Sequence, residues 1–119
     1  MSDYEITLPW SPSVNSMRAV FRNRMITTKK GRDYHKAVHK LMNELNLSGE
    51  NIADRLHVSM VLNPPTLRKY DIDNRCKAVF DALSQCAFWL DDEQIDSLSI
   101  KKGVKVKGGS IAIKVVKLL

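Results

Sequence analysis

Alternating apolar and polar positions predict four β-strands. They cover residues 4–8, 56–62, 95–100 and 111–116, and each segment alternates or concentrates aliphatic, aromatic and β-branched side chains. Gly108-Gly109 precedes the last strand, and a glycine pair between two such runs is typical of a hairpin. We therefore expect the last two strands to form a hairpin, whose first arm begins anywhere from Ser97 to Lys105.

Apolar residues spaced three and four apart predict two helices. The first runs from Gly31 to Leu45, and the second from about Asp73 to Cys86. Asp73 or Asn74 is placed to cap the second helix. The predicted buried stripes are Tyr34, Ala37, Val38, Leu41, Met42 and Leu45 in the first helix, and Cys76, Val79, Phe80, Leu83 and Ala87 in the second.

Between the first strand and the first helix, the segment from Trp10 to about Lys30 is predicted to be a polar, basic loop. Pro9 and Pro12 interrupt its start, and a loop of this length is commonly functional or mobile. The pattern as a whole indicates an α+β fold in a single domain spanning residues 1–119. That domain would hold a small mixed sheet of about four strands with two main helices on it.

Composition agrees with a compact protein that works inside the cell. The hydrophobic fraction is 44%, no apolar stretch is long enough to cross a bilayer, and the start has no signal-peptide pattern. Cys76 and Cys86 lie ten residues apart in one predicted helix, beyond disulfide reach. We expect two reduced cysteines and a cytoplasmic, DNA-associated protein.

The charges are distributed unevenly along the chain. The net charge is +6, which favours a polyanionic partner. Eight Lys and Arg residues stand between Arg18 and Lys40 against one acid, while seven of the 13 acids fall between Asp71 and Asp96. Carboxylates concentrated in a basic protein would repel the phosphates that the rest attracts. A divalent cation is the simplest group to neutralise them.

Two acidic segments make a candidate metal site. Asp71 and Asp73 point to the same side of an extended segment at the mouth of the second helix, where they repel each other unless a cation intervenes. Asp91 and Asp92 follow the helix, and Asp92 is the preferred third ligand, with Asp91 as a further candidate. Oxygen ligands without Cys or His suit Mg²⁺, with Mn²⁺ able to substitute.

Basic residues near these carboxylates complete the chemistry of phosphodiester hydrolysis. Lys77 lies four residues after Asp73 and faces the same side of the helix, where it can stabilise charge or orient water. The catalytic candidates are thus Asp71, Asp73, Asp92 and Lys77. The candidate DNA-binding residues are Arg68, Lys69, Arg75, Arg22, Arg24, Lys29 and Lys30.

The central block resembles the RusA family of Holliday-junction resolvases. The residues that carry the resemblance are Asp71-Ile72-Asp73-Asn74 with Lys77, Phe80-Asp81-Ala82-Leu83, and Phe88-Trp89-Leu90-Asp91-Asp92. The start, Ile6-Thr7-Leu8-Pro9-Trp10-Ser11-Pro12-Ser13 followed by Asn15, is similar to the opening of that family. The similarity covers nearly the whole chain.

The resemblance implies a homodimeric, magnesium-dependent endodeoxyribonuclease that nicks two opposed strands of a four-way junction in DNA recombination and repair. It implies carboxylate ligands at Asp71, Asp73 and Asp92 and an active-site lysine at Lys77, with no organic cofactor and no membrane partner. Thr66, Leu67 and Tyr70 stand where a run of arginines is typical. The departure concerns the DNA contacts more than the chemistry.

Structural roles compete with these functional ones. Asp73 could cap a helix, Asp71 could serve a turn, and one of Asp91 and Asp92 could cap the turn after the helix. Lys77 could pair with Asp81 on the helix surface, and Trp10 could stack on a base or pack its own loop. The alternative functions are a non-catalytic module that binds branched DNA and a nuclease for another nucleic-acid structure.

Overall fold

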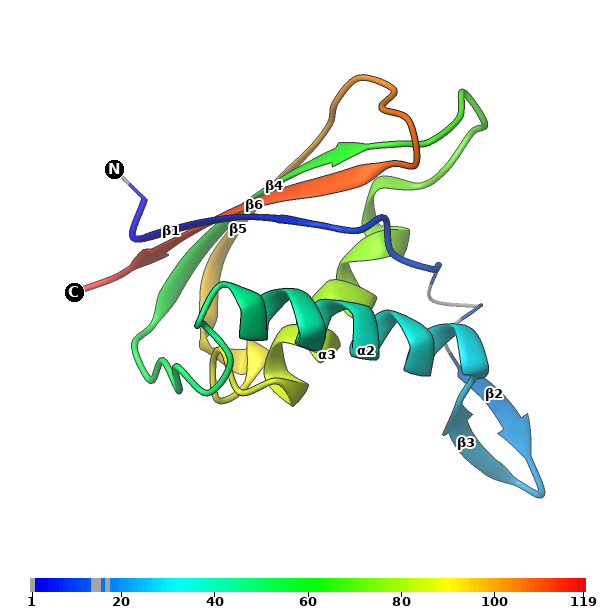
Figure 1. Ribbon diagram of the computed structural model, residues 1–119, viewed down its shortest axis with the longest axis horizontal. Coiled ribbons are helices and arrows are strands. Elements are labelled where there is room, and N and C mark those ends of the chain that lie inside the picture. Colours follow the sequence, from blue (N-terminus) through cyan, green and yellow to red (C-terminus); the bar gives the residue numbers. More distant parts are fainter. Residues whose placement is uncertain (1, 14–15, 17) are drawn as a thin grey trace.

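A computed structural model describes residues 2–13, 16 and 18–119 of the chain (Figure 1). Its main feature is a four-stranded mixed sheet in the order β1-β6-β4-β5. The strands are β1 (Tyr4–Leu8), β4 (Leu56–Asn63), β5 (Ile95–Lys102) and β6 (Ser110–Lys117). The predicted α+β class is confirmed, and all four predicted strands are present.

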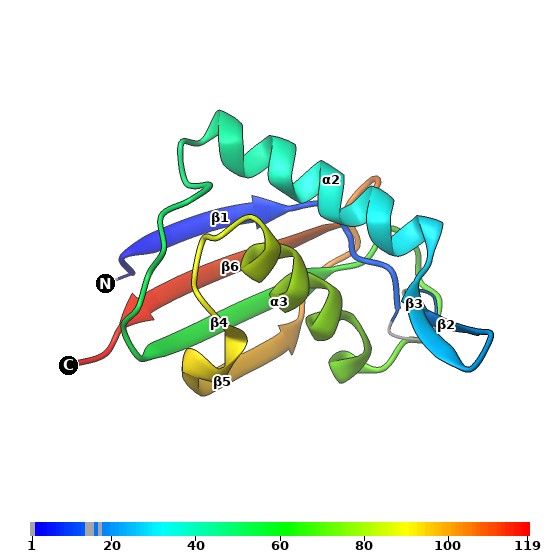
Figure 2. The same cartoon turned by 90° about the horizontal axis from the view of Figure 1, so that it is seen from below.

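Two helices, α2 (Lys29–Glu44) and α3 (Cys76–Gln85), cover one face of this sheet (Figure 2). In α2, Tyr34, Val38 and Met42 recur every four residues and are buried. Thr28 begins the helix, because its side-chain oxygen accepts a hydrogen bond from the Gly31 amide. No helix among the described residues is apolar over a length that could cross a membrane.

The core lies between the helices and the sheet. Along β4 every second residue is buried, from Leu56 through Val58 and Met60 to Leu62. Val79 and Leu83 of α3 and Phe88 and Trp89 after it are each 0% exposed. The predicted buried stripe of the second helix is confirmed from Cys76 to Leu83, while Ala87 is half-buried. Both cysteines are buried and free, as predicted.

The predicted hairpin between the last two strands is wrong. β5 pairs in parallel with β4, while β6 pairs in antiparallel fashion with both β4 and β1. Gly108 and Gly109 do form a turn, with φ angles of +76° and +74°. The sheet thus places β4 between these two strands.

The predicted loop from Trp10 to Lys30 is also wrong in its second half. Strands β2 (Arg18–Phe21) and β3 (Arg24–Thr27) form a separate two-stranded ribbon that projects beyond the start of α2 (Figure 1). Arg22 and Asn23 make its turn with φ angles of +51° and +62°, as the commonest two-residue hairpin turns require. Helix α2 accordingly starts two residues before the predicted Gly31.

The connection from β4 to β5 carries the whole candidate site. Parallel strands need a long crossover, and here it contains the 3₁₀ turn η1 (Ile72–Arg75), helix α3 and the 3₁₀ turn η2 (Asp92–Gln94). The predicted helix from Asp73 therefore begins as a 3₁₀ turn and becomes α-helical only at Cys76. Neither Asp73 nor Asn74 caps it, since Arg75 is the N-cap residue and makes no side-chain cap bond.

Candidate active site

Asp71 and Asp73 stand at the entrance of α3 with their carboxylates exposed. Asp71 is the N-cap residue of η1 yet makes no side-chain cap bond, and only its backbone oxygen is used, by the Asn74 amide. Within the described part of the chain, neither carboxylate has a hydrogen bond or an ion pair. The competing capping and turn roles therefore do not occupy these side chains, which are open to a cation.

Lys77 contacts one carboxylate of its own helix and one of the second acidic segment. Its Nζ lies 3.1 Å from Asp81 Oδ1 and 3.5 Å from Asp92 Oδ2. The hydrogen bond that Lys77 donates to Asp81 is the main cause that raises the pKa of Lys77, and the charges of Asp81 and Asp92 act in the same direction. The lysine is therefore held protonated. It makes both the helix-surface pair with Asp81 and a contact with the candidate metal ligand Asp92.

Asp91 and Asp92 have different surroundings. Asp91 caps η2, because its side chain accepts from the Glu93 amide, and this hydrogen bond is the main cause that lowers the pKa of Asp91. Asp92 is one residue further and contacts Lys77. The alternative of a capping aspartate thus describes Asp91, while Asp92 faces the lysine.

Gln94 fixes this acidic turn in place. The side chain is 6% exposed, and its Oε1 accepts from the amides of Leu90 and Asp91 at 2.9 and 2.8 Å. Its Nε2 donates to the backbone oxygens of Ile52 and Asp54 at 2.8 and 2.9 Å. A buried amide with both ends fully used holds the turn to the segment that precedes β4.

The three predicted carboxylate ligands do not form a closed metal cage. Among residues 2–13, 16 and 18–119, no group of three or more His, Cys, Asp or Glu side chains is placed to hold a metal ion. Asp92 instead contacts Lys77, a cationic side chain that attracts its carboxylate. A shared site requires Asp92 to exchange that contact for a cation.

Arg75 is the most unusual of the basic residues. Its Nη1 donates to the Ser11 backbone oxygen at 2.8 Å, and the guanidinium carbon lies 5.2 Å from the centre of the Trp10 ring. Burial lowers its pKa, its Nε is buried without a hydrogen bond, and none of the described carboxylates pairs with it. A half-buried cation with no counter-ion fits an anion such as a phosphate.

The other predicted DNA-binding residues fall into two groups. Arg68 and Lys69 line a surface pocket together with Arg75, and Lys30 lines an adjoining hollow. Lys29 is exposed and lies 3.9 Å from Asp33. Arg22 occupies the turn of the projecting ribbon; Arg24 belongs to β3, and its side chain lies outside what the structure describes.

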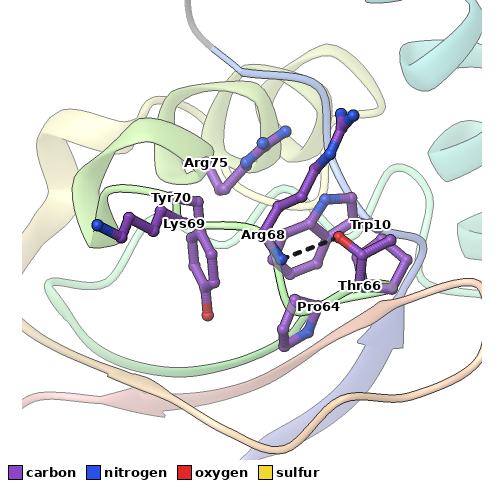
Figure 3. Close-up of a pocket in the computed structure, with 8 residues that line it drawn as sticks. Trp10, Pro64, Thr66, Arg68, Lys69, Tyr70 and Arg75 are labelled. Carbon is purple, nitrogen blue, oxygen red and sulfur yellow. Dashed lines mark hydrogen bonds between the residues drawn. The ribbon is translucent and has the colours of Figure 1, made fainter.

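The sequence offered Trp10 as a residue that could stack on a base, but it singled out neither Tyr70 nor Lys102 for a role near the site. Trp10 and Tyr70 flank the pocket of Arg68 and Lys69 (Figure 3), with ring centres 5.5 Å apart and planes at 86°. Lys102, from the end of β5, lies 4.5 Å above the Tyr70 ring. For Tyr70, the one available signal in the sequence was its position beside Asp71. Trp10 and Lys102 are distant from the aspartates in the chain.

Comparison with known proteins finds one family and several relatives. The family described as Endodeoxyribonuclease RusA matches residues 9–116. A crossover junction endodeoxyribonuclease of Enterobacteria phage HK97 is 33% identical over 118 residues, which cover 99% of this chain and 98% of the relative. The proteins of the same name from Escherichia coli K12 and Shigella sonnei are each 32% identical with the same coverage.

Proposed function

The chain belongs to the RusA family of endodeoxyribonucleases, and from this premise we propose that it resolves four-way DNA junctions by paired nicks. It is an enzyme that hydrolyses phosphodiester bonds of DNA. The observation that carries the finer proposal is the pair of exposed carboxylates, Asp71 and Asp73, without partners beside basic residues. Resolution of junctions would serve DNA recombination and repair.

The donors present fit a divalent cation with oxygen ligands. Asp71 and Asp73 supply carboxylate oxygens with no competing contact, and Asp92 is within reach of the same end of α3 through Lys77. We propose that these three hold Mg²⁺, with Mn²⁺ able to replace it. When bound, the ion lowers the pKa of a coordinated water and polarises the phosphoryl oxygen.

The protein's own groups have separate tasks in this proposal. Lys77 carries a positive charge to the reacting phosphate, and Asp81 keeps that charge in place when Asp92 turns to the cation. Arg75, Arg68 and Lys69 hold the phosphodiester backbone next to the carboxylates. Gln94 keeps Asp92 at a defined position.

We propose that the working form is a homodimer bound to branched DNA. Two copies related by a two-fold axis would present two sites to the two opposed strands of a junction, which has the same symmetry. Affinity would come mainly from phosphate contacts, and the choice of substrate from branched shape.

Replacing each proposed ligand tests the function directly. We expect Asp71→Asn, Asp73→Asn and Asp92→Asn each to lower cleavage of a synthetic four-way junction by at least about a hundredfold, because each removes an anionic metal ligand. Junction binding should persist or strengthen, since a negative charge near phosphate is lost. Cleavage is measured on denaturing gels with Mg²⁺, and binding by fluorescence anisotropy with EDTA.

Control reactions separate the alternatives. Glu44→Gln removes an exposed carboxylate from the last residue of α2, away from the residues that line the site, and should cut normally. Junction, flap, duplex and RNA substrates compared in one experiment identify the preferred target. Wild-type protein that binds a junction but never nicks it at any Mg²⁺ concentration would contradict the proposal.

A further inference from the structure

A pocket of about 370 Å³ opens beside the candidate active site (Figure 3). Trp10 and Tyr70 line it with their rings in edge-to-face contact, and Pro64 lies below them. Two adjoining hollows also include Arg75: one continues past Ser11 to Lys30 and Asp33, and the other reaches Tyr70 and Asp71. Together they form a groove, here called the aromatic groove, that leads from the start of α2 to Asp71.

The aromatic groove is mainly basic. Five cationic side chains line it, and the acidic ones are Asp33 and the candidate ligand Asp71. Arg68 and Lys69 are exposed, and none of the described carboxylates pairs with either of them. The cationic residues are Lys30, Arg68, Lys69, Arg75 and Lys102. Their arrangement fits a phosphate backbone that follows the groove.

The two rings are held firmly by their surroundings. Trp10 lies under the Arg75 guanidinium, and a Cβ atom added at Gly109 would come within 2.8 Å of the Trp10 Cβ. Lys102 lies over the Tyr70 ring and donates to the Tyr70 backbone oxygen at 2.7 Å. The pocket is therefore formed in advance, at no cost in ordering these rings when a ligand binds.

We propose that this pocket receives one unpaired nucleobase of the DNA strand that is cut. The proposal rests on the proposed function and adds a subsite to it. Flat aromatic walls bind any base through its π-face, and the neighbouring cations bind the adjoining phosphates. Tyr70 directly precedes Asp71, so a base that lies against the Tyr70 ring brings its own phosphate close to the carboxylates.

A branched substrate supplies such a base at low cost. Extruding a base from an intact duplex loses pairing and stacking, and this cost is least where the base is already unpaired. Strands exchange at the centre of a junction, where bases can leave the stack. The pocket would thus favour cleavage next to the branch point over cleavage within an arm.

Abasic nucleotides combined with pocket variants test this subsite. Junctions with a single abasic position, moved one nucleotide at a time across the cut site, keep every phosphate and remove one base. We expect one position to lower wild-type affinity by roughly 5- to 100-fold, the range that stacking of one base gives. Binding is measured by anisotropy with EDTA, so that no cleavage occurs.

Tyr70→Ala should weaken binding to the intact junction to a similar extent. For this variant, the abasic nucleotide at the sensitive position should cause no further loss of affinity. Tyr70→Leu, which keeps apolar bulk without a π-face, repeats the test should the alanine variant unfold. Tyr70→Phe keeps the ring, so this variant should again lose affinity at the sensitive abasic position, as the wild type does. Leu67→Ala changes an exposed residue of the same loop and should leave the abasic profile as in the wild type.

Two outcomes overturn the subsite. In one, no abasic position lowers affinity; in the other, the losses from Tyr70→Ala and the abasic nucleotide simply multiply, which shows independence. Either result leaves the nuclease proposal intact if the wild-type protein cuts the same junction with Mg²⁺. Conversely, a protein that never cuts can still show the coupling, so the two failures are distinguishable.

Discussion

Four aspartates at the two ends of α3 differ in what their carboxylates contact. Asp91 is used by a turn amide, Asp92 by Lys77, and Asp71 and Asp73 by no described side chain or amide. Residue type alone would rank them equally as metal ligands. Their partners separate them, since a carboxylate engaged in capping must give up a hydrogen bond before it binds a cation.

Lys77 and Asp81 offer a test at the level of single residues. We expect Lys77→Met to lower junction cleavage by about a hundredfold, the usual cost of removing one electrostatic donor from a reacting centre. Asp81→Asn is the matched change on the other side of the 3.1 Å pair; it leaves the lysine charge present and should lower cleavage far less than Lys77→Met does. Similar rates for the two variants would remove Lys77 from the mechanism.

Gln94 offers a second test, of positioning. Gln94→Leu leaves two buried amides and two backbone oxygens without their partner, so we expect the melting temperature to fall by about 10 °C. Below that temperature, cleavage should fall more than junction binding, because Asp92 loses its support. Gln85→Leu makes the same substitution at an exposed position of α3 and should melt within about 2 °C of wild type. Equal melting of the two variants would contradict this role.

At the level of elements, Arg55 ties the entrance of β4 to η2 and β5. It contacts Glu93 at 2.9 Å and also bonds Asp96, and these hydrogen bonds raise the pKa of Arg55. The same contact with Arg55 lowers the pKa of Asp96. A lowered carboxyl pKa stabilises the fold above the unfolded value of about 3.9, and this contribution disappears as the pH falls through the lower folded value.

The stability of the protein should therefore depend on acid through this pair. We expect Arg55→Gln to lower the melting temperature at pH 6, and the difference from wild type to shrink steadily between pH 5 and pH 3. Thermal unfolding followed by circular dichroism at each pH measures both proteins. A difference that stays constant down to pH 3 would show that the ion pair contributes through packing alone.

Elements with strong periodicity were predictable, and pairing was not. The stripes of α2 and the full alternation of β4 identified both correctly from neighbouring residues. The β2–β3 ribbon was not predicted, because its residues do not alternate clearly and its Arg22-Asn23 turn lacks glycine. The pairing partner of β5 was not predicted, because Gly108-Gly109 indicates a turn but does not indicate which strand pairs with β5.

In the candidate site too, residues within a local pattern were predictable, and residues brought together by the fold were not. Asp71, Asp73, Lys77 and Asp92 could be selected from local spacing and from a family resemblance, and the chain does belong to that family. The aromatic groove unites residues from the first loop, the crossover and the end of β5, which no local pattern connects. Gln94 was missed because its importance comes from four hydrogen bonds, visible only in the fold.

At the level of the whole molecule, cations gather in the aromatic groove and the carboxylates stand at its end. Binding to a junction should weaken steeply with salt, because each phosphate contact releases condensed counterions. We expect Arg75→Gln to reduce the slope of log affinity against log salt by about one. Lys114→Gln, which alters a lysine of β6 paired with Glu5, should leave the slope unchanged. Identical slopes for all three proteins would exclude Arg75 from phosphate contact.

All four catalytic candidates lie inside the single crossover that joins the parallel strands β4 and β5. The edge strand β5 cannot detach from the sheet without displacing η2, which carries Asp92. A ligand that binds both Asp71 and Asp92 therefore also resists local opening of that edge. Ligand binding at the site should therefore slow hydrogen exchange at the β5 amides, in a part of the backbone that the ligand does not contact.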